Sequence, residues 1–140
     1  MAITKQEFYE GAALHRLVRS GDVTSIRYEP PFFWMNDRVL VNLKYCTRGR
    51  SPWGFTFMPD EQVLLEKNAA EFTLVIGLVC GADGVAAFTY AAYRSIAVPR
   101  PAAIHIACYR NHGKHYEVSG PDGVLPGKIA PSNWQRILEL

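Results

Sequence analysis

The sequence predicts an α+β domain in which a mixed β-sheet is flanked by helices. Three observations support this fold class. A helix with a start signal opens the chain, strand-length apolar runs fill its middle, and its 140 residues are enough to bury one core. The 49% apolar and 20% charged residues are ordinary for a globular protein. We therefore interpret residues 1–140 as a single domain.

The first predicted element is a helix from about Lys5 to Arg19. Thr4 and Glu7 have the spacing of a capping box, in which each side chain satisfies a free backbone N–H of the first turn. Ser20-Gly21-Asp22 is expected to end the helix.

Glu10 occupies an unusual place on this helix. On a helical wheel, Leu14, Leu17 and Val18 define the apolar face, and Glu10 falls on that same face. A carboxylate that points toward a core is a candidate functional group.

The middle of the chain predicts strands separated by one helix. In chain order we expect Val23–Tyr28 continuing extended through Phe32–Met35, Val39–Cys46, Gly54–Met58, a helix from Pro59 to about Ala70 with Asp60 as its N-cap, Thr73–Cys80 and Val85–Tyr93. Ile104–Tyr109 and His115–Val118 then predict a hairpin, and Ser132 with Gln135 predicts a short C-terminal helix.

A two-residue turn at Asn36-Asp37 fixes an expected register for the first hairpin. On that register Glu29 lies directly opposite Lys44, and Pro31 lies opposite Asn42. Directly opposed side chains lie about 5 Å apart at Cβ, so Glu29, Asn42 and Lys44 would share one face that Glu10 could approach.

Glu10, Glu29 and the triplet Asn42-Leu43-Lys44 resemble the PD-(D/E)xK nuclease superfamily, which includes restriction enzymes. Its pattern is a helix, a hairpin with an acid beginning the second strand, and acid-x-Lys on the third strand. The resemblance covers about Thr4 to Cys80 and implies a restriction-endonuclease-like core, here with an added C-terminal hairpin. Asn42 departs from the pattern, because an amide replaces the second acid.

The resemblance implies hydrolysis of DNA or RNA with Mg²⁺ or Mn²⁺. Glu29 and Asn42 would hold the metal, Glu10 would assist as a further catalytic group, and Lys44 would support the attacking water. The loss of one anionic ligand at Asn42 would weaken the metal site. The alternative for Glu29 and Lys44 is an ordinary cross-strand ion pair.

Other polar groups offer weaker candidates. Arg48 and Arg50 follow the Lys44 strand and would contact nucleic-acid phosphates. His112 and His115 have the residue types for acid–base chemistry on RNA, but we favour the interpretation that they belong to a polar hairpin tip.

Composition leaves the partner open. A net charge of +2 is too mild to indicate nucleic-acid binding by itself. Three separated cysteines in apolar surroundings favour buried thiols over a disulfide framework, and we expect a cytoplasmic protein without a membrane span. The competing hypothesis is a non-enzymatic interaction module on the same scaffold, such as an immunity or defence-system subunit, that binds a protein partner or forms a homodimer.

Overall fold

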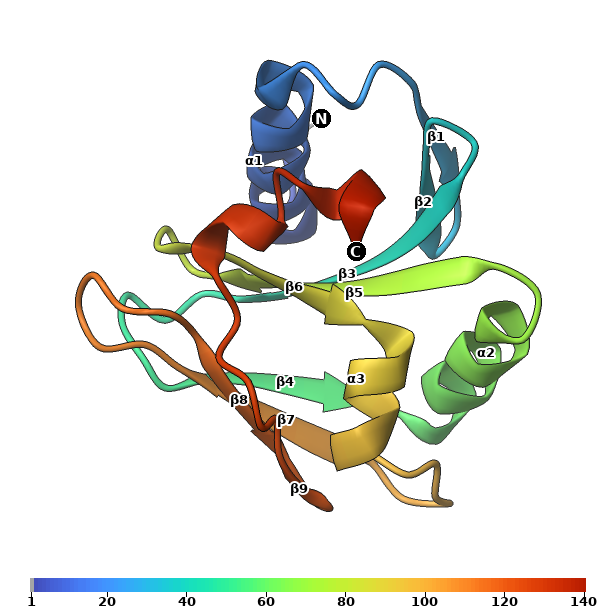
Figure 1. Cartoon of the computed structure of the whole chain (residues 1–140), viewed down its shortest axis with the longest axis vertical. Coiled ribbons are helices and arrows are strands. Elements are labelled where there is room, and N and C mark those ends of the chain that lie inside the picture. Colours follow the sequence, from blue (N-terminus) through green and yellow to red (C-terminus); the bar gives the residue numbers. More distant parts are fainter. Residues whose placement is uncertain (1) are drawn as a thin grey trace.

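A computed structural model describes residues 2–140 and confirms the α+β class. Figure 1 shows three layers, with helix α1 and the C-terminal segment above a five-stranded sheet and a second, four-stranded sheet below it. The elements in chain order are α1 (Lys5–Ser20), β1 (Ile26–Glu29), β2 (Phe32–Met35), β3 (Val39–Cys46), β4 (Trp53–Phe57), α2 (Pro59–Ala69), β5 (Thr73–Cys80), β6 (Gly84–Thr89), α3 (Tyr90–Ile96), β7 (Ile104–Tyr109), β8 (Glu117–Gly120), β9 (Gly123–Val124), η1 (Pro131–Asn133) and η2 (Ile137–Glu139).

The capping box of α1 forms as predicted. The Glu7 backbone N–H donates to Thr4 Oγ1 and the Thr4 N–H donates to Glu7 Oε1, both at 3.1 Å. The buried face of the helix consists of Glu10, Ala13 and Leu17, whereas Val18 is exposed and does not belong to it. Glu10 therefore points inward as the helical wheel predicts.

The five-stranded sheet, sheet A, has the strand order β1-β2-β3-β5-β6. Strands β3 and β5 have the predicted bounds and run parallel, and α2 lies in the connection between them. Alternating residues of β3 serve different cores: Val39 and Val41 pack toward α1, while Leu40 packs toward the second sheet. Both faces of sheet A are thus covered.

The expected first hairpin is wrong. Residues 23–35 do not form one extended strand; β1 and β2 form a hairpin of their own across Pro30-Pro31. Proline has no backbone N–H to donate, so two in succession do not continue a ladder. Glu29 consequently pairs with Phe32 and not with Lys44.

The β2–β3 register also differs from the expected one. Asn36 and Asp37 both have positive φ, as a tight turn needs, but Met35 pairs with Val39 and Phe32 pairs with Asn42. The position directly opposite Asn42 is therefore Phe32, where Pro31 was expected.

Three later elements differ from the sequence predictions. The second strand of the predicted C-terminal hairpin, His115–Val118, is observed as β8 at Glu117–Gly120. The predicted strand Val85–Tyr93 ends at Thr89, because the Thr89 hydroxyl accepts a hydrogen bond from the Ala92 N–H at 3.2 Å and starts α3. The predicted C-terminal helix consists of two short 3₁₀ turns, η1 and η2.

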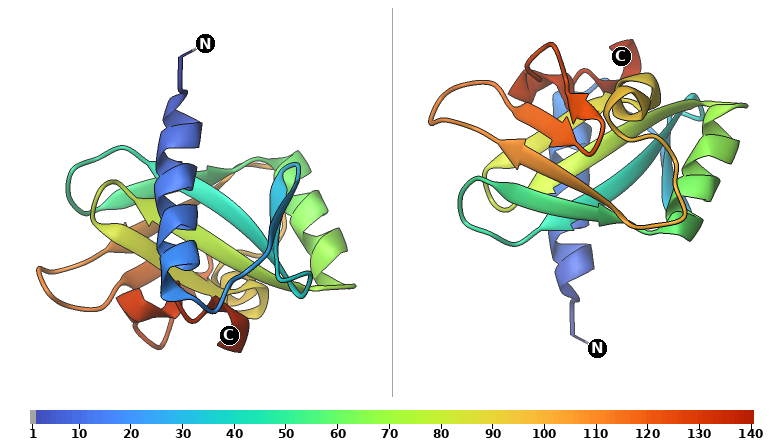
Figure 2. Two further views of the ribbon diagram at one scale, coloured as in Figure 1. Left: turned by 90° about the horizontal axis from the view of Figure 1, so that it is seen from above. Right: turned by 90° about the horizontal axis from the view of Figure 1, so that it is seen from below.

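The second sheet, sheet B, has the order β4-β7-β8-β9 and packs against sheet A. Its outer strand β4 pairs with β7 on one side, which leaves the other edge of β4 next to sheet A. Figure 2 shows α1 lying across sheet A with its N-terminal turns projecting beyond the strands. Helix α1 and strand β4 therefore both lie beside β3 at one edge of the molecule.

Candidate functional site

The main polar cavity lies beside β3, at the point where β3 no longer pairs with β2. Strand β2 pairs with β3 only from Val39 to Asn42, so the edge of β3 is open from Leu43 onward. A cavity of about 460 Å³ occupies this place between α1, β3, β4 and α2. We call it the edge pocket; its lining residues are Gln6, Glu10, Pro31, Asn42, Leu43, Lys44, Tyr45, Gly54, Phe55, Thr56 and Glu61.

The edge pocket brings together three of the residues that the sequence singled out, namely Glu10, Asn42 and Lys44. Asn42 and Lys44 alternate with Leu43 on β3 and so share a face of the strand. That face is the one turned toward sheet B, whereas Glu10 comes from α1 on the opposite face of β3 and joins the cavity at the open edge of the strand. Tyr9 of α1 stacks on Tyr45 with ring centroids 5.5 Å apart. This stacking fixes the N-terminal half of α1 beside the open edge.

Glu29 is absent from the edge pocket. Its Oε2 accepts hydrogen bonds from Arg27 Nη1 at 2.9 Å and from Trp34 Nε1 at 3.0 Å, and its side chain is 62% exposed. The expected convergence of Glu29 with Asn42 and Lys44 is therefore wrong. The cause is the separate β1–β2 hairpin, which carries Glu29 to the outer edge of sheet A.

Glu61 is the acid that sequence reasoning missed. It stands at the third position of α2, where its Oε1 accepts the Met58 N–H at 3.1 Å, so Met58 and not Asp60 is the N-cap. Its Oε2 accepts from Lys44 Nζ at 2.7 Å. The available signal was the acid two residues after Pro59, a capping-box position for a proline-started helix.

Lys44 is held firmly in the edge pocket. Besides the ion pair with Glu61, its Nζ lies 4.9 Å from the centroid of the Phe57 ring. Both charged side chains are largely withdrawn from solvent. The pair therefore places a cation at the wall of a polar cavity.

Asn42 carries the most informative atom of the cavity. The residue is 5% exposed, and its Oδ1 has no hydrogen-bond partner among residues 2–140. A buried acceptor without a partner costs about 1–3 kcal/mol, and a bound water or ion is one way to satisfy it. Tyr90, Tyr93 and Gln135 also carry such an oxygen, but of the four only Asn42 lines the edge pocket.

Glu10 is also unusual, because it is a 9% exposed carboxylate. Burial raises the pKa of Glu10, and hydrogen bonding to Gln6 and the charge of Lys44 only partly oppose that shift. A buried carboxylate facing a cation is typical of sites that bind ions or polar substrates.

The donor set was tested against the metal that the sequence implies. Within residues 2–140, no three His, Cys, Asp or Glu side chains are grouped so as to hold a metal ion. The edge pocket instead offers two carboxylates and the partnerless amide oxygen of Asn42. These are hard oxygen donors of the kind that Mg²⁺ and Mn²⁺ bind, with one charge fewer than three acids would supply.

The remaining candidates lie outside the edge pocket. Arg48 and Arg50 are exposed in the β3–β4 loop, and His112 and His115 are exposed in the β7–β8 loop.

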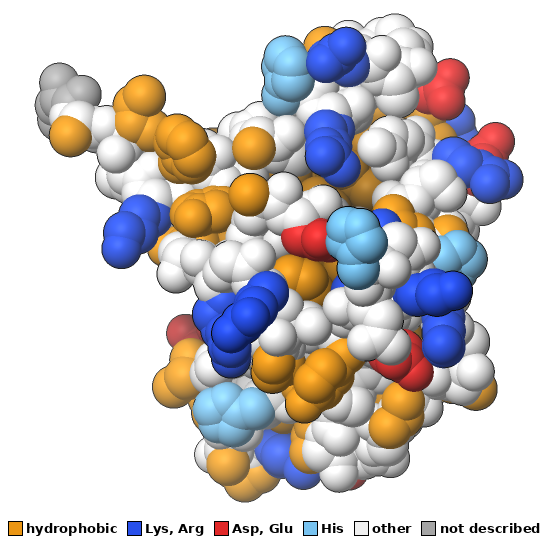
Figure 3. Space-filling view, turned by 90° about the vertical axis from the view of Figure 1, so that its left-hand side faces the viewer, with side chains coloured by type: hydrophobic (Ala, Val, Ile, Leu, Met, Phe, Trp, Pro, Cys, Tyr) orange, Lys and Arg blue, Asp and Glu red, His pale blue; other side chains and the backbone are white. Residues whose placement is uncertain are grey.

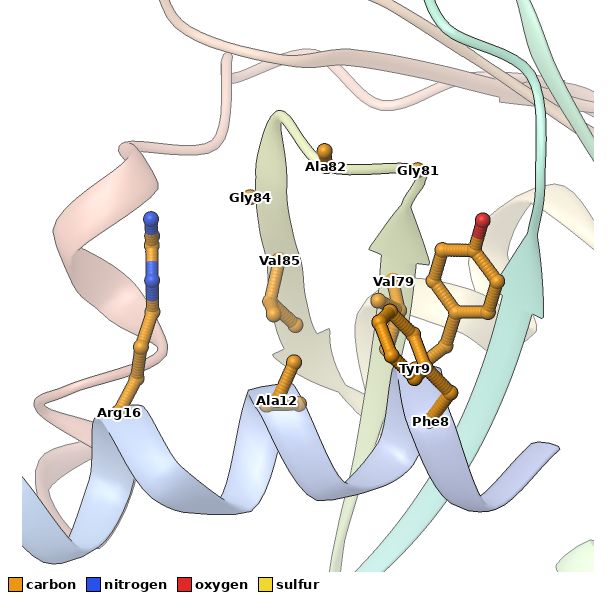
Figure 4. Close-up of a pocket in the computed structure, with 10 residues that line it drawn as sticks. Phe8, Tyr9, Ala12, Arg16, Val79, Gly81, Ala82, Gly84 and Val85 are labelled. Carbon is orange, nitrogen blue, oxygen red and sulfur yellow. The ribbon is translucent and has the colours of Figure 1, made fainter. Parts of the chain in front are cut away.

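A second cavity, of about 210 Å³, is apolar. It lies between α1 and the β5–β6 hairpin and is shown in Figure 4, where Phe8, Tyr9 and Ala12 face Val79 and Val85, and Arg16 extends along one side. It contains no carboxylate and so does not share the chemistry of the edge pocket.

Comparison of the chain with protein-family models, with curated proteins and with solved structures gave no match. No helix in the described residues is long and apolar enough to cross a membrane.

Proposed function

We propose that this protein is nuclease-like and that the edge pocket binds and hydrolyses a phosphodiester of nucleic acid with the help of Mg²⁺ or Mn²⁺. The observation that carries the proposal is the partnerless Oδ1 of Asn42 in a cavity shared with Glu10, Lys44 and Glu61. The helix acid Glu10 and the triplet Asn42-Leu43-Lys44 keep their places in the pattern that the sequence resembles, whereas the second carboxylate, Glu61, follows the lysine.

Glu10, Glu61 and Asn42 Oδ1 are the groups that would hold the ion. When bound, such an ion polarises the phosphate and lowers the pKa of an attacking water. Glu61 takes the part that the sequence assigned to Glu29, because it is the second carboxylate of the cavity.

Lys44 supplies the positive charge that the reaction needs. In the structure it is neutralised by Glu61 at 2.7 Å. An ammonium group at this wall of the cavity would stabilise negative charge that develops on a phosphate and would orient water.

The site is expected to be weak. Asn42 is neutral, and Phe32, its direct neighbour on β2, is a buried aromatic. Affinity for hard cations falls as charged ligands are lost. Cleavage should therefore need a higher metal concentration here than at a site with three acids.

The test is cleavage of plasmid DNA and of RNA with Mn²⁺ by matched variants. Glu61→Gln and Lys44→Met should each lower the cleavage rate at least about a hundredfold, as expected for loss of one electrostatic group. Glu29→Gln and Lys67→Met should cleave like the unmodified protein, since both residues lie outside the cavity. Equal losses in Glu29→Gln and Glu61→Gln, or no Mn²⁺-dependent cleavage at all, would overturn the proposal.

A second candidate, a non-enzymatic interaction module, is supported by α1. Its outer surface exposes Phe8 and Val18, which are 67% and 56% accessible. Exposed apolar side chains beside an apolar cavity favour a protein contact. Light scattering that shows a dimer, lost in Phe8→Ser, together with absence of cleavage, would favour this function over the first.

A further inference from the structure

Three loops meet at one end of the molecule. They are the β3–β4 loop (residues 47–52), the β5–β6 turn (residues 81–83) and the β7–β8 loop (residues 110–116), all on the left of Figure 1. Because they come from both sheets, their proximity follows from the way the sheets pack and is invisible in the sequence.

Direct hydrogen bonds hold these loops together. Ser51 Oγ donates to the Arg110 carbonyl at 3.1 Å, which joins the first loop to the third. The Gly81 N–H donates to the Cys46 carbonyl at 2.8 Å. Gly81 has a φ of +54°, and a Cβ there would lie 2.2 Å from the Arg48 carbonyl oxygen, so this close approach requires glycine.

Positive charge gathers on this end. We define the basic end by its five cationic side chains, Arg16, Arg48, Arg50, Arg110 and Lys114. Figure 3 faces it and shows Lys, Arg and His side chains spread over the surface. Arg16 belongs to it because it extends beside the β5–β6 hairpin, with Nη1 3.7 Å from the place of a Cβ on Gly84 (Figure 4).

One carboxylate stands among the three loops. Asp83 Oδ2 accepts from Arg110 Nη1 at 2.8 Å and from the Tyr116 hydroxyl at 2.7 Å, so its charge is satisfied internally. Five cations against one carboxylate exceed the net +2 of the whole chain, so the rest of the protein is net negative. The basic end together with Asp83 carries a charge of +4, and Figure 3 shows further Asp and Glu side chains on the same face.

The basic end is continuous with the edge pocket. The β3–β4 loop begins three residues after Lys44 and leads into β4, whose Gly54 and Thr56 line the cavity. Three residues of strand span about 10 Å, and each strand of a duplex carries one phosphate per about 3.4 Å of helix axis. A chain with one phosphate at Lys44 would thus bring further phosphates to Arg48 and Arg50.

We infer that the basic end binds the sugar–phosphate backbone of a nucleic acid and guides it into the edge pocket. This inference rests on the proposed function and adds Arg16, Arg110 and Lys114 to the surface that contacts the polymer. Repeated phosphates match cations spread over several rigid loops, and contacts of this kind position a strand without reading its sequence.

The experiment measures binding separately from cleavage. Fluorescence anisotropy of labelled DNA and RNA oligonucleotides is followed in EDTA at several salt concentrations. The variant is Arg48→Glu with Arg50→Glu, and the matched control is Arg38→Glu with Lys67→Glu, two exposed cations at the β2–β3 turn and in α2. Circular dichroism and thermal melting check that both double variants fold.

The basic-end variant should bind at least about tenfold more weakly than the control. The slope of log K against log salt should become shallower by about 2, one unit for each phosphate that the protein no longer neutralises. Lys114→Glu should reduce the slope by about 1. Equal weakening in the control, or binding to anionic lipid vesicles but not to oligonucleotides, would overturn the inference.

The two proposals fail in different ways. Normal Mn²⁺-dependent cleavage with no effect of the basic-end variant on binding would remove the inference and leave the nuclease function. Binding with the expected salt slope, but without cleavage in any metal, would remove the nuclease function and leave a nucleic-acid-binding surface.

Discussion

Asn42 is the neutral residue among the charged side chains of Glu10, Lys44 and Glu61 that line the edge pocket. Its carbonyl oxygen is buried and lacks a hydrogen-bond partner within the described chain. An amide oxygen can bind a cation but does not add negative charge, so in the proposed metal site Asn42 would be a ligand without charge.

Asn42→Asp should therefore strengthen Mn²⁺ binding by about an order of magnitude, because it restores a charged ligand. Without metal, the same variant should melt below the unmodified protein, because it adds an uncompensated charge to a buried position near Glu10. Isothermal titration calorimetry and melting curves with and without Mn²⁺ measure both effects. Asn133→Asp is the control, and an affinity unchanged by Asn42→Asp would show that position 42 does not line a metal site.

At the residue scale, the sequence predicted what depends on local geometry. Helical spacing placed Glu10 on the buried face of α1, and strand alternation placed Asn42 and Lys44 on one face of β3. Glu29 was misplaced because its position depended on a long register carried across Pro30-Pro31. Glu61 was missed because its approach to Lys44 depends on how α2 packs, which no local pattern shows.

The β5–β6 turn is an element whose role is to join the two sheets. Asp83 reaches from sheet A to Tyr116 and Arg110, which flank the β7–β8 loop of sheet B. Burial alone would raise the pKa of Asp83, but hydrogen bonds from Tyr116 and Arg110 and the charge of Arg110 outweigh burial and lower it.

Asp83→Asn should lower the free energy of unfolding by about 1–3 kcal/mol at neutral pH, as for removal of a charged hydrogen bond. A carboxyl group with a lowered pKa in the folded state stabilises the protein above the ordinary aspartate value of about 4 and loses this contribution as the pH falls through the folded pKa. The difference in free energy of unfolding between the unmodified protein and Asp83→Asn should thus be largest near neutral pH and should shrink below about pH 4. Urea unfolding at several pH values measures it, with Asp22→Asn as the control; a gap independent of pH would contradict the expected role of the carboxylate.

The C-terminal segment shows why some elements could be placed only by the structure. Its 3₁₀ turns are too short to have a periodic pattern, yet Trp134 is 1% exposed and packs against sheet A under α1. The indole Nε1 donates to the Ala13 carbonyl at 2.8 Å, a contact between opposite ends of the chain. Strands β3 and β5, which are long and strongly patterned, were predicted with their observed bounds.

Trp134→Ala should lower the free energy of unfolding by about 3–5 kcal/mol, since it removes a large buried side chain and leaves a cavity. Trp34→Ala, at a half-buried position of β2, should cost clearly less. Urea denaturation followed by circular dichroism compares the two variants. Similar losses for both would show that the C-terminal segment is not held against the core.

At the scale of the whole molecule, sheets A and B share one apolar core. The continuous apolar run of β5 is typical of a strand covered on both sides, but β4 and β7 pair across about fifty residues of chain, a contact that no local pattern contains. Cys80 of β5 and Cys108 of β7 mark the junction, with sulfur atoms 3.8 Å apart and both residues fully buried.

The two sheets should therefore unfold as one unit. The reactivity of Cys80 and Cys108 toward an alkylating reagent measures this, because each thiol is buried between the sheets in the folded protein. The hydrogen bond to Cys108 and burial together raise the pKa of the Cys80 thiol, so it is a poor nucleophile in the folded state. In the native protein an alkylating reagent should modify half-buried Cys46 and leave Cys80 and Cys108 intact. With rising urea, Cys80 and Cys108 should become reactive over the same concentration range, as measured by mass spectrometry of labelled peptides. Modification of Cys108 at clearly lower urea than Cys80 would mean that sheet B opens while sheet A stays folded. The basic end, whose loops come from both sheets, and the edge pocket, which β4 of sheet B lines, would then both be lost before sheet A unfolds.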